Sequence, residues 1–359
     1  MKVIISGGGT GGHLSPALAL GETLKRMRPD TDFLFIGTTA GLDEQFLSRS
    51  GFRYELLDVG GVRGHGVREA AVSIGKMVAA IFKARSLLKA HRPTLVVGVG
   101  GYASMPSAVA ALTLGIPLIL MEQNTRPGLT NRVLARFARR ICVAFEDSLP
   151  LLPHARVQVT GNPVRFIPVN NLNPHPDLFS ILVLGGSSGA HRLNLGALSA
   201  FKILNKAVIK VSIIHQTGAA DEGLVRSGYQ QAGIEAEVTP FIHDMAGAFA
   251  RADLVVARAG AMTVSEIALA GRPAIFVPYP FHRDHQQEYN ARTLERQGGA
   301  LIIADDENLG VNLARAIGEL IADRPRLRAM AERTLSAAKP DAAATIAKAC
   351  LEIAEAEAA

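Results

Sequence analysis

The feature that most constrains this sequence is a local pattern that occurs twice: a short apolar run, a glycine-rich loop and a helical segment. Residues 3–6 (VIIS) lead into residues 7–13 (GGGTGGH), and residues 180–184 (SILVL) lead into residues 185–190 (GGSSGA). Short runs of Val, Ile and Leu are typical of strands that are covered on both faces. A strand, a glycine loop and a helix together open a doubly wound α/β domain. The sequence therefore predicts two such domains in tandem.

Further apolar runs alternate with helical patterns along the chain. They predict strands at residues 33–37, 95–99, 118–121 and 141–144, and then at 211–215, 254–257, 274–277 and 301–303. Strands separated by helices form parallel sheets with right-handed crossovers. With 359 residues, 48% of them hydrophobic and 19% charged, the chain is too long for one typical domain and too apolar to be disordered.

A segment rich in Pro and Asn, residues 161–176, separates the two halves. We place the boundary there, which gives an N-terminal domain of residues 1–162 and a C-terminal domain of residues 163–339. The last helix, residues 340–359, carries Ile346, Cys350 and Ile353 on one face. This spacing predicts that the helix docks on a core, but it does not identify which domain supplies that core.

Charge and cysteine content narrow the function classes only partly. The net charge of +6 favours an anionic partner, which leaves phosphorylated substrates, anionic lipid, nucleic acid and simple solubility open. Two cysteines outside any Cys-x-x-Cys pair indicate a reducing compartment. Residues 94–121 carry no charge, but their Gly and Pro residues favour strand, helix (107–114) and strand over a membrane span.

The first glycine loop formally matches a dinucleotide fingerprint. The second strand, however, ends in residues 35–39 (FIGTT) without the carboxylate that would hold a nicotinamide cofactor's ribose. We therefore expect the loop to cradle a diphosphate instead, before a helix that starts near Pro16 with Ser15 as its N-cap. His13, at the end of the loop, is a candidate general base, and the alternative is a histidine that only caps or packs locally.

Four other segments carry candidate binding groups. Residues 185–190 predict a second phosphate loop, or else a tight turn without a ligand. Residues 258–266 (RAGAMTVSE) predict a helix opening near Thr263, with Glu266 in the first turn, where it either complements the helix dipole or accepts two ribose hydroxyls. Gln286 and Gln287 suit sugar hydroxyls, because each amide donates and accepts hydrogen bonds. The neighbouring histidines match no zinc spacing. Residues 121–124 (MEQN) and 161–165 (GNPVR) add polar groups at strand ends.

In this order, the segments at residues 7–13, 98–102, 122–124, 161–165, 185–190, 260–266 and 284–287 resemble the MurG family of UDP-N-acetylglucosamine (UDP-GlcNAc) transferases. The resemblance covers most of the chain and departs from the family pattern at Met121, Ala259 and Ser107. It implies an α/β GT-B fold, with two Rossmann-like doubly wound domains facing a central crevice. The N-terminal domain would bind acceptor and membrane, with helix 340–359 packed back on it, and the C-terminal domain would bind UDP-GlcNAc.

The same resemblance assigns site residues. It implies that His13 is catalytic, that Ile242 reads uracil mainly through backbone groups, that Glu266 holds the ribose and that Gln286 and Gln287 hold the sugar. It implies no metal and no cofactor. The full set of implied UDP-GlcNAc contacts is Thr10, Gly11, Gly12, Asn124, Arg165, Ser187, Ile242, Ala261, Met262, Thr263, Val264, Ser265, Glu266, Gln286 and Gln287.

The implied reaction is an inverting transfer of GlcNAc from UDP-GlcNAc to undecaprenyl-pyrophosphoryl-MurNAc-pentapeptide, in peptidoglycan synthesis. Partners would be these two substrates and an anionic membrane surface, but no nucleic acid. The protein would be peripheral, at the cytoplasmic face of the bacterial inner membrane. Alternatives are a UDP-sugar:diacylglycerol glycosyltransferase, a UDP-GlcNAc 2-epimerase and a non-catalytic nucleotide-sugar-binding protein.

Residues 74–88 are a candidate membrane contact, and an ordinary core-facing helix explains them equally well. The segment combines apolar side chains (Met77, Val78, Ile81, Phe82, Leu88) with basic ones in it and just after it (Lys76, Lys83, Arg85, Lys89).

Overall fold

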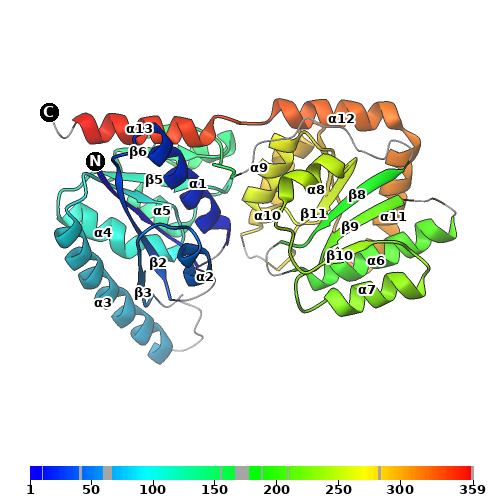
Figure 1. The fold of residues 1–359 in the computed structure, drawn as a ribbon, viewed down its shortest axis with the longest axis horizontal. Coiled ribbons are helices and arrows are strands. Elements are labelled where there is room, and N and C mark those ends of the chain that lie inside the picture. Colours follow the sequence, from blue (N-terminus) through cyan, green and yellow to red (C-terminus); the bar gives the residue numbers. More distant parts are fainter. Residues whose placement is uncertain are drawn as a thin grey trace. The chain divides into compact units, whose positions relative to one another are not determined.

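The computed structural model divides the chain into two compact units (Figure 1). It describes residues 1–9, 11–39, 43–59, 67–153, 156–165, 178–186, 189–207, 209, 211–281 and 284–356, without the side chains of residues 67–71. The N-terminal unit is Met1–Arg165 with Pro340–Ala359, and the C-terminal unit is Phe166–Lys339. The change of unit thus follows Arg165 rather than Asn162.

A parallel sheet forms the centre of the described N-terminal unit, with the strand order β3-β2-β1-β4-β5-β6-β7. The order reverses between β1 and β4, which pair from Val3 with Leu95 to Ser6 with Gly98. In such doubly wound sheets, ligands bind beyond the carboxyl ends of the strands at the reversal. The strands are β1 (Lys2–Ser6), β2 (Asp32–Thr38), β3 (Tyr54–Leu57), β4 (Leu95–Gly98), β5 (Leu118–Glu122), β6 (Arg140–Val143) and β7 (Val157–Val159).

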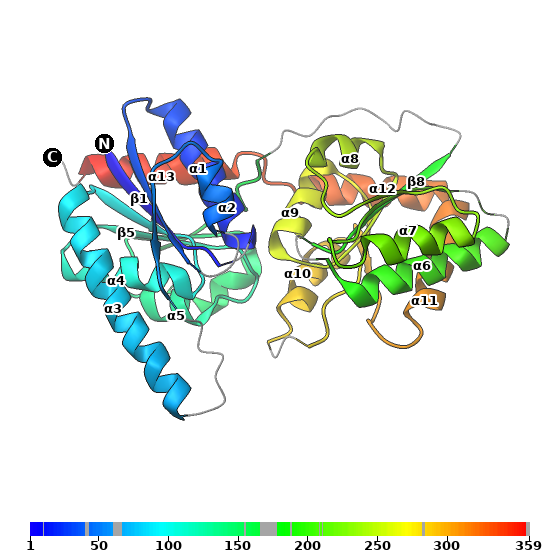
Figure 2. The ribbon, with the colours of Figure 1, turned by 60° about the horizontal axis from the view of Figure 1, so that its bottom comes forward.

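Helices cover both faces of this sheet. They are α1 (Gly11–Met27), α2 (Asp43–Ser48), α3 (Val67–His91), α4 (Met105–Thr113), α5 (Leu129–Leu134) and α13 (Ala342–Ala356), with short 3-10 turns at Tyr102–Ser104 and Glu146–Leu151. On one face, α3, α4 and α5 bury a cluster that includes Ala84 and Leu134, and Figure 2 shows these helices on one side of the sheet. On the other face, Ile346 and Cys350 of α13 pack in one cluster with Leu14 of α1.

The described C-terminal unit repeats the design, with the order β10-β9-β8-β11-β12-β13 and a reversal between β8 and β11. Its strands are β8 (Phe179–Leu184), β9 (Val211–Gln216), β10 (Glu237–Thr239), β11 (Leu254–Ala257), β12 (Ala274–Phe276) and β13 (Ala300–Ile302). Its helices are α6 (His191–Lys206), α7 (Glu222–Gln231), α8 (Met245–Arg251), α9 (Ala261–Ala270), α10 (Gln286–Glu295), α11 (Leu309–Ala322) and α12 (Arg324–Ser336).

The structure confirms the predicted fold class, and the predicted strands all occur, with ends shifted by a residue or two. The sequence missed β3, β7 and β10, three of the four edge strands of the described sheets, whereas the fourth, β13, has the apolar sequence ALI and was found. Edge strands are covered less completely, so they need no continuous apolar run; β3 reads YELL and β7 reads VQV.

The uncharged stretch at residues 94–121 forms β4, α4 and β5, as expected, rather than a span. In the part of the chain that the structure describes, no helix combines the length and the hydropathy that crossing a bilayer requires.

Candidate active site

The first glycine loop lies at the strand reversal of the N-terminal unit. Gly7 has a φ of +147°, and a Cβ there would lie 2.4 Å from Cγ2 of Val99, so the close approach of the β1 and β4 ends requires glycine. At Gly8, a Cβ would lie 1.7 Å from Oδ2 of Asp43. The loop therefore packs directly against a carboxylate.

Asp43 holds this loop in place, although no sequence pattern singled it out. Its carboxylate accepts hydrogen bonds from the Gly9 N–H at 2.7 Å and the Thr38 N–H at 2.8 Å. Burial raises the pKa of Asp43, while these two hydrogen bonds and the nearby His13 act to lower it. Asp43, a carboxylate that follows β2, thus binds backbone N–H groups of the loop and of the end of β2.

The helix after the loop begins at Gly11, not near Pro16, so the predicted helix start and the Ser15 N-cap were wrong. Glycines 11 and 12 form the first turn, and Pro16 lies inside the helix at the cost of one backbone hydrogen bond. As a result, His13 lies on the first turn of α1 rather than in a loop.

The His13 ring is held on two sides. Its Nδ1 lies 3.0 Å from Oε1 of Gln123, a buried side chain. With the amide in this orientation Nδ1–H is the donor, which leaves the Nε2 lone pair available. On the other side lie Gly100 and Gly101, where a Cβ on Gly101 would be only 3.2 Å from Nε2. Among the described atoms, Nε2 of Gln123 is buried without a hydrogen-bond partner.

Glu122 organises the loop that carries the predicted Asn124 contact. Its buried carboxylate accepts hydrogen bonds from the N–H groups of Asn124 and Gly128, both at 3.0 Å, and from Nδ2 of Asn131 at 2.8 Å. These bonds fix the chain beyond β5, at the same edge of the sheet as His13. Arg165, another predicted contact, pairs with Glu22 of α1 at 2.7 Å.

In the C-terminal unit, the second glycine loop also needs its glycines. A Cβ on Gly189, whose φ is +78°, would lie 2.2 Å from the Thr217 carbonyl oxygen. The loop is connected to Ile242 by a residue that the sequence did not reveal. Gln216 donates from Nε2 to the Gly186 carbonyl at 3.0 Å and accepts from the Ile242 N–H at 2.9 Å. That N–H of the predicted uracil contact is therefore already occupied.

The third segment predicted to bind an anion forms the start of α9. Gly260 is the N-cap and the helix begins at Ala261, so Thr263 lies in the first turn and Glu266 in the second. The expectation that Glu266 lies in the first turn was wrong, because the helix starts two residues earlier than Thr263. Burial raises the pKa of Glu266 to about 7, and no described residue forms a hydrogen bond or ion pair with it. A carboxylate that pays this desolvation cost without a partner is a candidate ligand-binding group.

The two predicted sugar-binding amides open α10. Gln286 is its first residue, and Oε1 of Gln287 accepts a hydrogen bond from the Tyr279 N–H at 2.9 Å. Two predicted contacts, Thr10 and Ser187, lie outside the described residues. The structure thus gathers Gly11, Gly12, His13 and Asn124 at the carboxyl edge of one sheet, and Ala261–Glu266 and Gln286 at that of the other.

Comparison with known proteins identifies the family. Residues 3–143 match the glycosyltransferase family 28 N-terminal domain, and residues 180–346 match the glycosyltransferase family 28 C-terminal domain. A Geobacter sulfurreducens protein named UDP-N-acetylglucosamine–N-acetylmuramyl-(pentapeptide) pyrophosphoryl-undecaprenol N-acetylglucosamine transferase is 40% identical over 352 residues, covering 96% of this chain and 97% of that protein. A Myxococcus xanthus protein of the same name is 39% identical and covers 98% of this chain and 93% of its own length.

Solved structures agree with this assignment. The crystal structure of Acinetobacter baumannii MurG is 31% identical, with a TM-score of 0.80, covering 98% of this chain and 99% of that one. A UDP-GlcNAc 2-epimerase from Neisseria meningitidis has a TM-score of 0.68 at 15% identity, which shows a shared fold only, over 98% of this chain and 100% of that one. The chain therefore belongs to the MurG family of UDP-N-acetylglucosamine–N-acetylmuramyl-(pentapeptide) pyrophosphoryl-undecaprenol N-acetylglucosamine transferases, and it has both domains of glycosyltransferase family 28.

Proposed function

We propose that this enzyme transfers GlcNAc from UDP-GlcNAc to undecaprenyl-pyrophosphoryl-MurNAc-pentapeptide, with inversion at the anomeric carbon. The observation that carries the proposal is the near full-length identity of 40% with relatives named for this reaction. Likeness to 2-epimerases is limited to the fold, and no observation favours a diacylglycerol acceptor.

His13 is proposed as the general base. The bond from Nδ1 to Gln123 leaves the lone pair of Nε2 available, and this nitrogen would take the proton of the attacking sugar hydroxyl. Asp43 supports the role through geometry, because its carboxylate holds the Gly9 and Thr38 N–H groups and so fixes the loop that leads into the turn carrying His13.

The donor would be bound mainly by the C-terminal unit. The N-termini of α6 and α9 follow the second glycine loop and Gly260, and their positive dipole ends would stabilise the leaving diphosphate. Glu266 would accept the ribose hydroxyls, and Gln286 and Gln287 would bind the sugar. Ser187, Ile242 and the first turns of α9 would contact UDP, while Thr10, Gly11, Gly12, Asn124 and Arg165 would complete the donor contacts.

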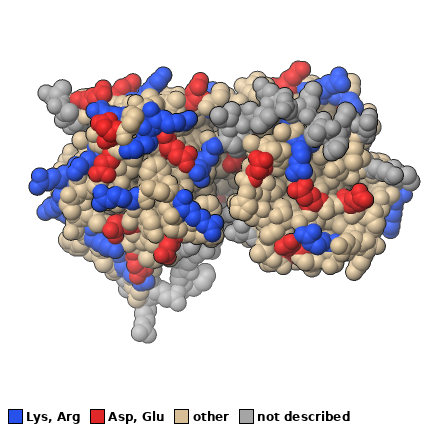
Figure 3. All heavy atoms as spheres, in the orientation of Figure 1, with Lys and Arg blue, Asp and Glu red and all other residues tan. Residues whose placement is uncertain are grey.

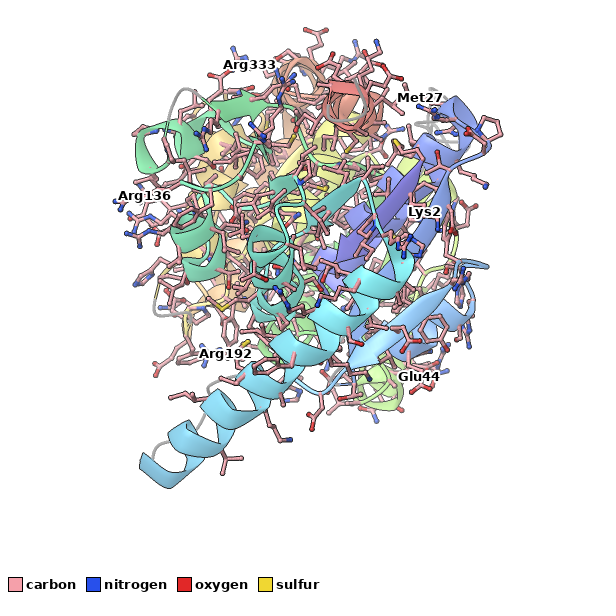
Figure 4. All side chains as sticks on the ribbon, turned by 90° about the vertical axis from the view of Figure 1, so that its left-hand side faces the viewer. Lys2, Met27, Glu44, Arg136, Arg192 and Arg333 are labelled. Atoms are coloured by element: carbon pink, nitrogen blue, oxygen red, sulfur yellow. The ribbon has the colours of Figure 1, made fainter. Side chains whose placement is uncertain are left out.

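The membrane surface is proposed to lie along α3, which extends past the edge of the sheet in Figures 2 and 4. Its inner face packs Ala84 and Leu88 into the core, whereas Ile74, Val78 and Phe82, each one turn apart, are 62%, 47% and 69% exposed. An ordinary core-facing helix does not need such an outer apolar stripe. Three of the four basic side chains are held within the unit, since Lys76 pairs with Asp58, Lys83 donates to the Leu56 carbonyl and Arg85 donates to the Thr113 carbonyl.

Among the residues that the structure describes, the face drawn in Figure 3 carries no broad basic surface. On the face drawn in Figure 3, Lys and Arg side chains are interspersed with Asp and Glu. We therefore place the enzyme at the cytoplasmic face of the inner membrane as a peripheral protein, where its lipid-linked acceptor and its nucleotide-sugar donor meet.

Product analysis tests the proposal. Wild-type enzyme is incubated with UDP-GlcNAc and either a short-chain lipid-linked MurNAc-pentapeptide or diacylglycerol, and the products are identified by mass spectrometry. A GlcNAc–MurNAc lipid formed only from the first acceptor is expected. Glycosylated diacylglycerol would replace the proposal by the diacylglycerol alternative. Conversion of UDP-GlcNAc without any acceptor to UDP-N-acetylmannosamine, which has the same mass and is separated from the donor by chromatography, or to free N-acetylmannosamine and UDP, would replace it by the epimerase.

A further inference from the structure

Beyond the residues proposed to touch substrate, the described C-terminal unit contains a buried ion triad whose centre is Asp305. The Asp305 side chain is 0% exposed, and its two carboxylate oxygens bind two different guanidinium groups. Oδ1 accepts from Nε of Arg192 at 2.7 Å, and Oδ2 accepts from Nη2 of Arg258 at 2.8 Å. Arg192 also donates to the Asp305 carbonyl oxygen at 3.0 Å.

The triad connects the segments that follow three strands in one half of the sheet, β8, β11 and β13. Arg192 lies in the first turn of α6, just after the second glycine loop, and Figure 4 labels it. Arg258 directly follows β11 and precedes Gly260, the N-cap of α9. Asp305 lies shortly after β13. Because β8, β11, β12 and β13 are neighbours in that order, the triad spans the carboxyl edge where the donor is proposed to bind.

Arg258 extends the connection to the segment after β12. Its Nη1 donates to the carbonyl oxygens of Val277 at 2.9 Å and Pro278 at 3.3 Å. Its guanidinium lies 5.7 Å from the centre of the Tyr279 ring, and the Tyr279 N–H donates to Gln287. The Arg192 guanidinium lies 6.0 Å from the ring of Phe281.

A further hydrogen bond connects α10 to the segment before α9. The buried Asn290 of α10 donates from Nδ2 to the Ala259 carbonyl at 3.3 Å, which ties the helix carrying both sugar-binding amides to the start of α9. The diphosphate, ribose and sugar contacts are therefore carried by segments whose relative positions depend on one web of hydrogen bonds.

A carboxylate with no exposure is costly to bury unless cations and hydrogen bonds compensate it. Here both cations come from separate donor-binding segments, and one of them, Arg192, lies half in solvent. A role limited to folding would not need a partner on the first turn after the second glycine loop. The arrangement instead suits a group that fixes the distance between two anion-binding helix ends.

We infer that Asp305 is a positioning residue for the nucleotide sugar, and that it acts by clamping Arg192 and Arg258 so that the N-termini of α6 and α9 and the start of α10 are held ready for the donor. The inference rests on the proposed function, because it presumes that UDP-GlcNAc binds at this edge. It predicts an effect on donor affinity rather than on the chemical step.

The deciding variant is Arg192→Met, which keeps the aliphatic stem and removes the charge at a site that is 46% exposed. Its matched control is Arg251→Met. Arg251 is 43% exposed and pairs with Glu237 at 2.8 Å in the same unit, away from these segments. Both full-length variants are checked for folding by circular dichroism and thermal melting, and UDP-GlcNAc binding is then measured by calorimetry alongside steady-state kinetics.

Arg192→Met is expected to weaken UDP-GlcNAc binding and to raise its KM about tenfold, as for loss of a charge-assisted hydrogen bond, with kcat changed by no more than about twofold. Arg251→Met should behave as wild type. Asp305→Asn should have a larger effect in the same direction if it folds, but the conclusion depends on Arg192→Met.

Wild-type donor affinity in Arg192→Met, or an equal loss in both Arg variants, would overturn the inference while leaving the proposed function intact. Failure of the wild-type enzyme itself to bind UDP-GlcNAc would instead overturn the proposed function, and the inference with it.

Discussion

The raised pKa of Glu266 makes donor binding depend on pH in a direction that can be calculated. Its pKa is about 7 because the carboxyl is desolvated. With this pKa, the Glu266 carboxyl is ionised in about one-tenth of the free enzyme molecules at pH 6, in half of them at pH 7 and in about nine-tenths at pH 8. The ionised form offers one acceptor oxygen to each ribose hydroxyl, whereas the protonated form uses one of its two oxygens as a donor and binds the hydroxyl pair more weakly. The apparent Kd for UDP-GlcNAc should therefore fall about tenfold from pH 6 to pH 8 and then level off.

Calorimetric titration with UDP-GlcNAc over this range measures the effect. The intact UDP-sugar is preferable to UDP, because a terminal phosphate has a second pKa of about 6 that would overlap with the titration. Glu266→Gln, which keeps one acceptor oxygen, should bind more weakly at pH 8 and lose the pH dependence. A wild-type Kd that does not change from pH 6 to pH 8, or a pH dependence that remains in Glu266→Gln, would show that titration of Glu266 does not control donor affinity.

The same pKa has a consequence for stability. A carboxyl whose pKa is higher in the folded protein than its ordinary 4.5 favours the folded state most at low pH, and this contribution is lost as the pH rises from about 4.5 to about 7. Glu266→Gln should therefore raise the melting temperature at pH 8 more than at pH 5. An equal change at both pH values would show that the folded-state pKa is not raised.

Three further predictions follow from packing and exposure. In Gly8→Ala, the new methyl group would displace the Asp43 carboxylate from the Gly9 and Thr38 N–H groups. Denaturant titration should then show a free energy of unfolding that is lower by about 2–4 kcal/mol. The control Gly75→Ala adds its methyl group in open space and should be neutral or stabilising. Phe82→Asp should reduce co-sedimentation with anionic vesicles without lowering stability. The control Leu335→Asp changes an exposed apolar side chain of the C-terminal unit and should leave co-sedimentation unchanged. Equal binding of vesicles by the two variants would argue against a membrane contact on α3. Burial raises the pKa of Cys142 to about 12 and also raises that of Cys350. Ellman's reagent should therefore modify both thiols only after unfolding. Rapid reaction with the native protein would contradict their placement in the core.

The sequence predicted what depends on continuous local patterns. Buried parallel strands need apolar runs, so the inner strands and both glycine loops could be found without a structure. The edge strands β3, β7 and β10 could not, because half-covered strands tolerate polar residues, whereas the edge strand β13 kept an apolar run and was found. The start of α1 was misjudged because Gly and Pro usually mark helix ends, while here the close packing of the loop against Asp43 and Val99 leads directly into the helix.

The supporting residues of the candidate site carried no local signal. Asp43, Gln216 and Asp305 bind Gly9, Gly186 and Arg258, which lie far away in the sequence, and nothing near them distinguishes them from surface polar residues. Glu266 was found from its motif, but its raised pKa depends on surroundings that only the folded unit provides.

The central claim is that this enzyme moves GlcNAc to a lipid-linked acceptor with His13 as the base. The most direct test measures incorporation of radiolabelled GlcNAc from UDP-GlcNAc into a short-chain lipid-linked MurNAc-pentapeptide, without added divalent metal, for wild type and His13→Ala in parallel. Labelled lipid and released UDP are expected from the wild type, and His13→Ala should lose at least about a hundredfold in kcat while its UDP-GlcNAc affinity is retained. Near-normal turnover by His13→Ala would remove the base assignment, and no labelled lipid from a wild-type enzyme that binds UDP-GlcNAc would contradict the proposed acceptor.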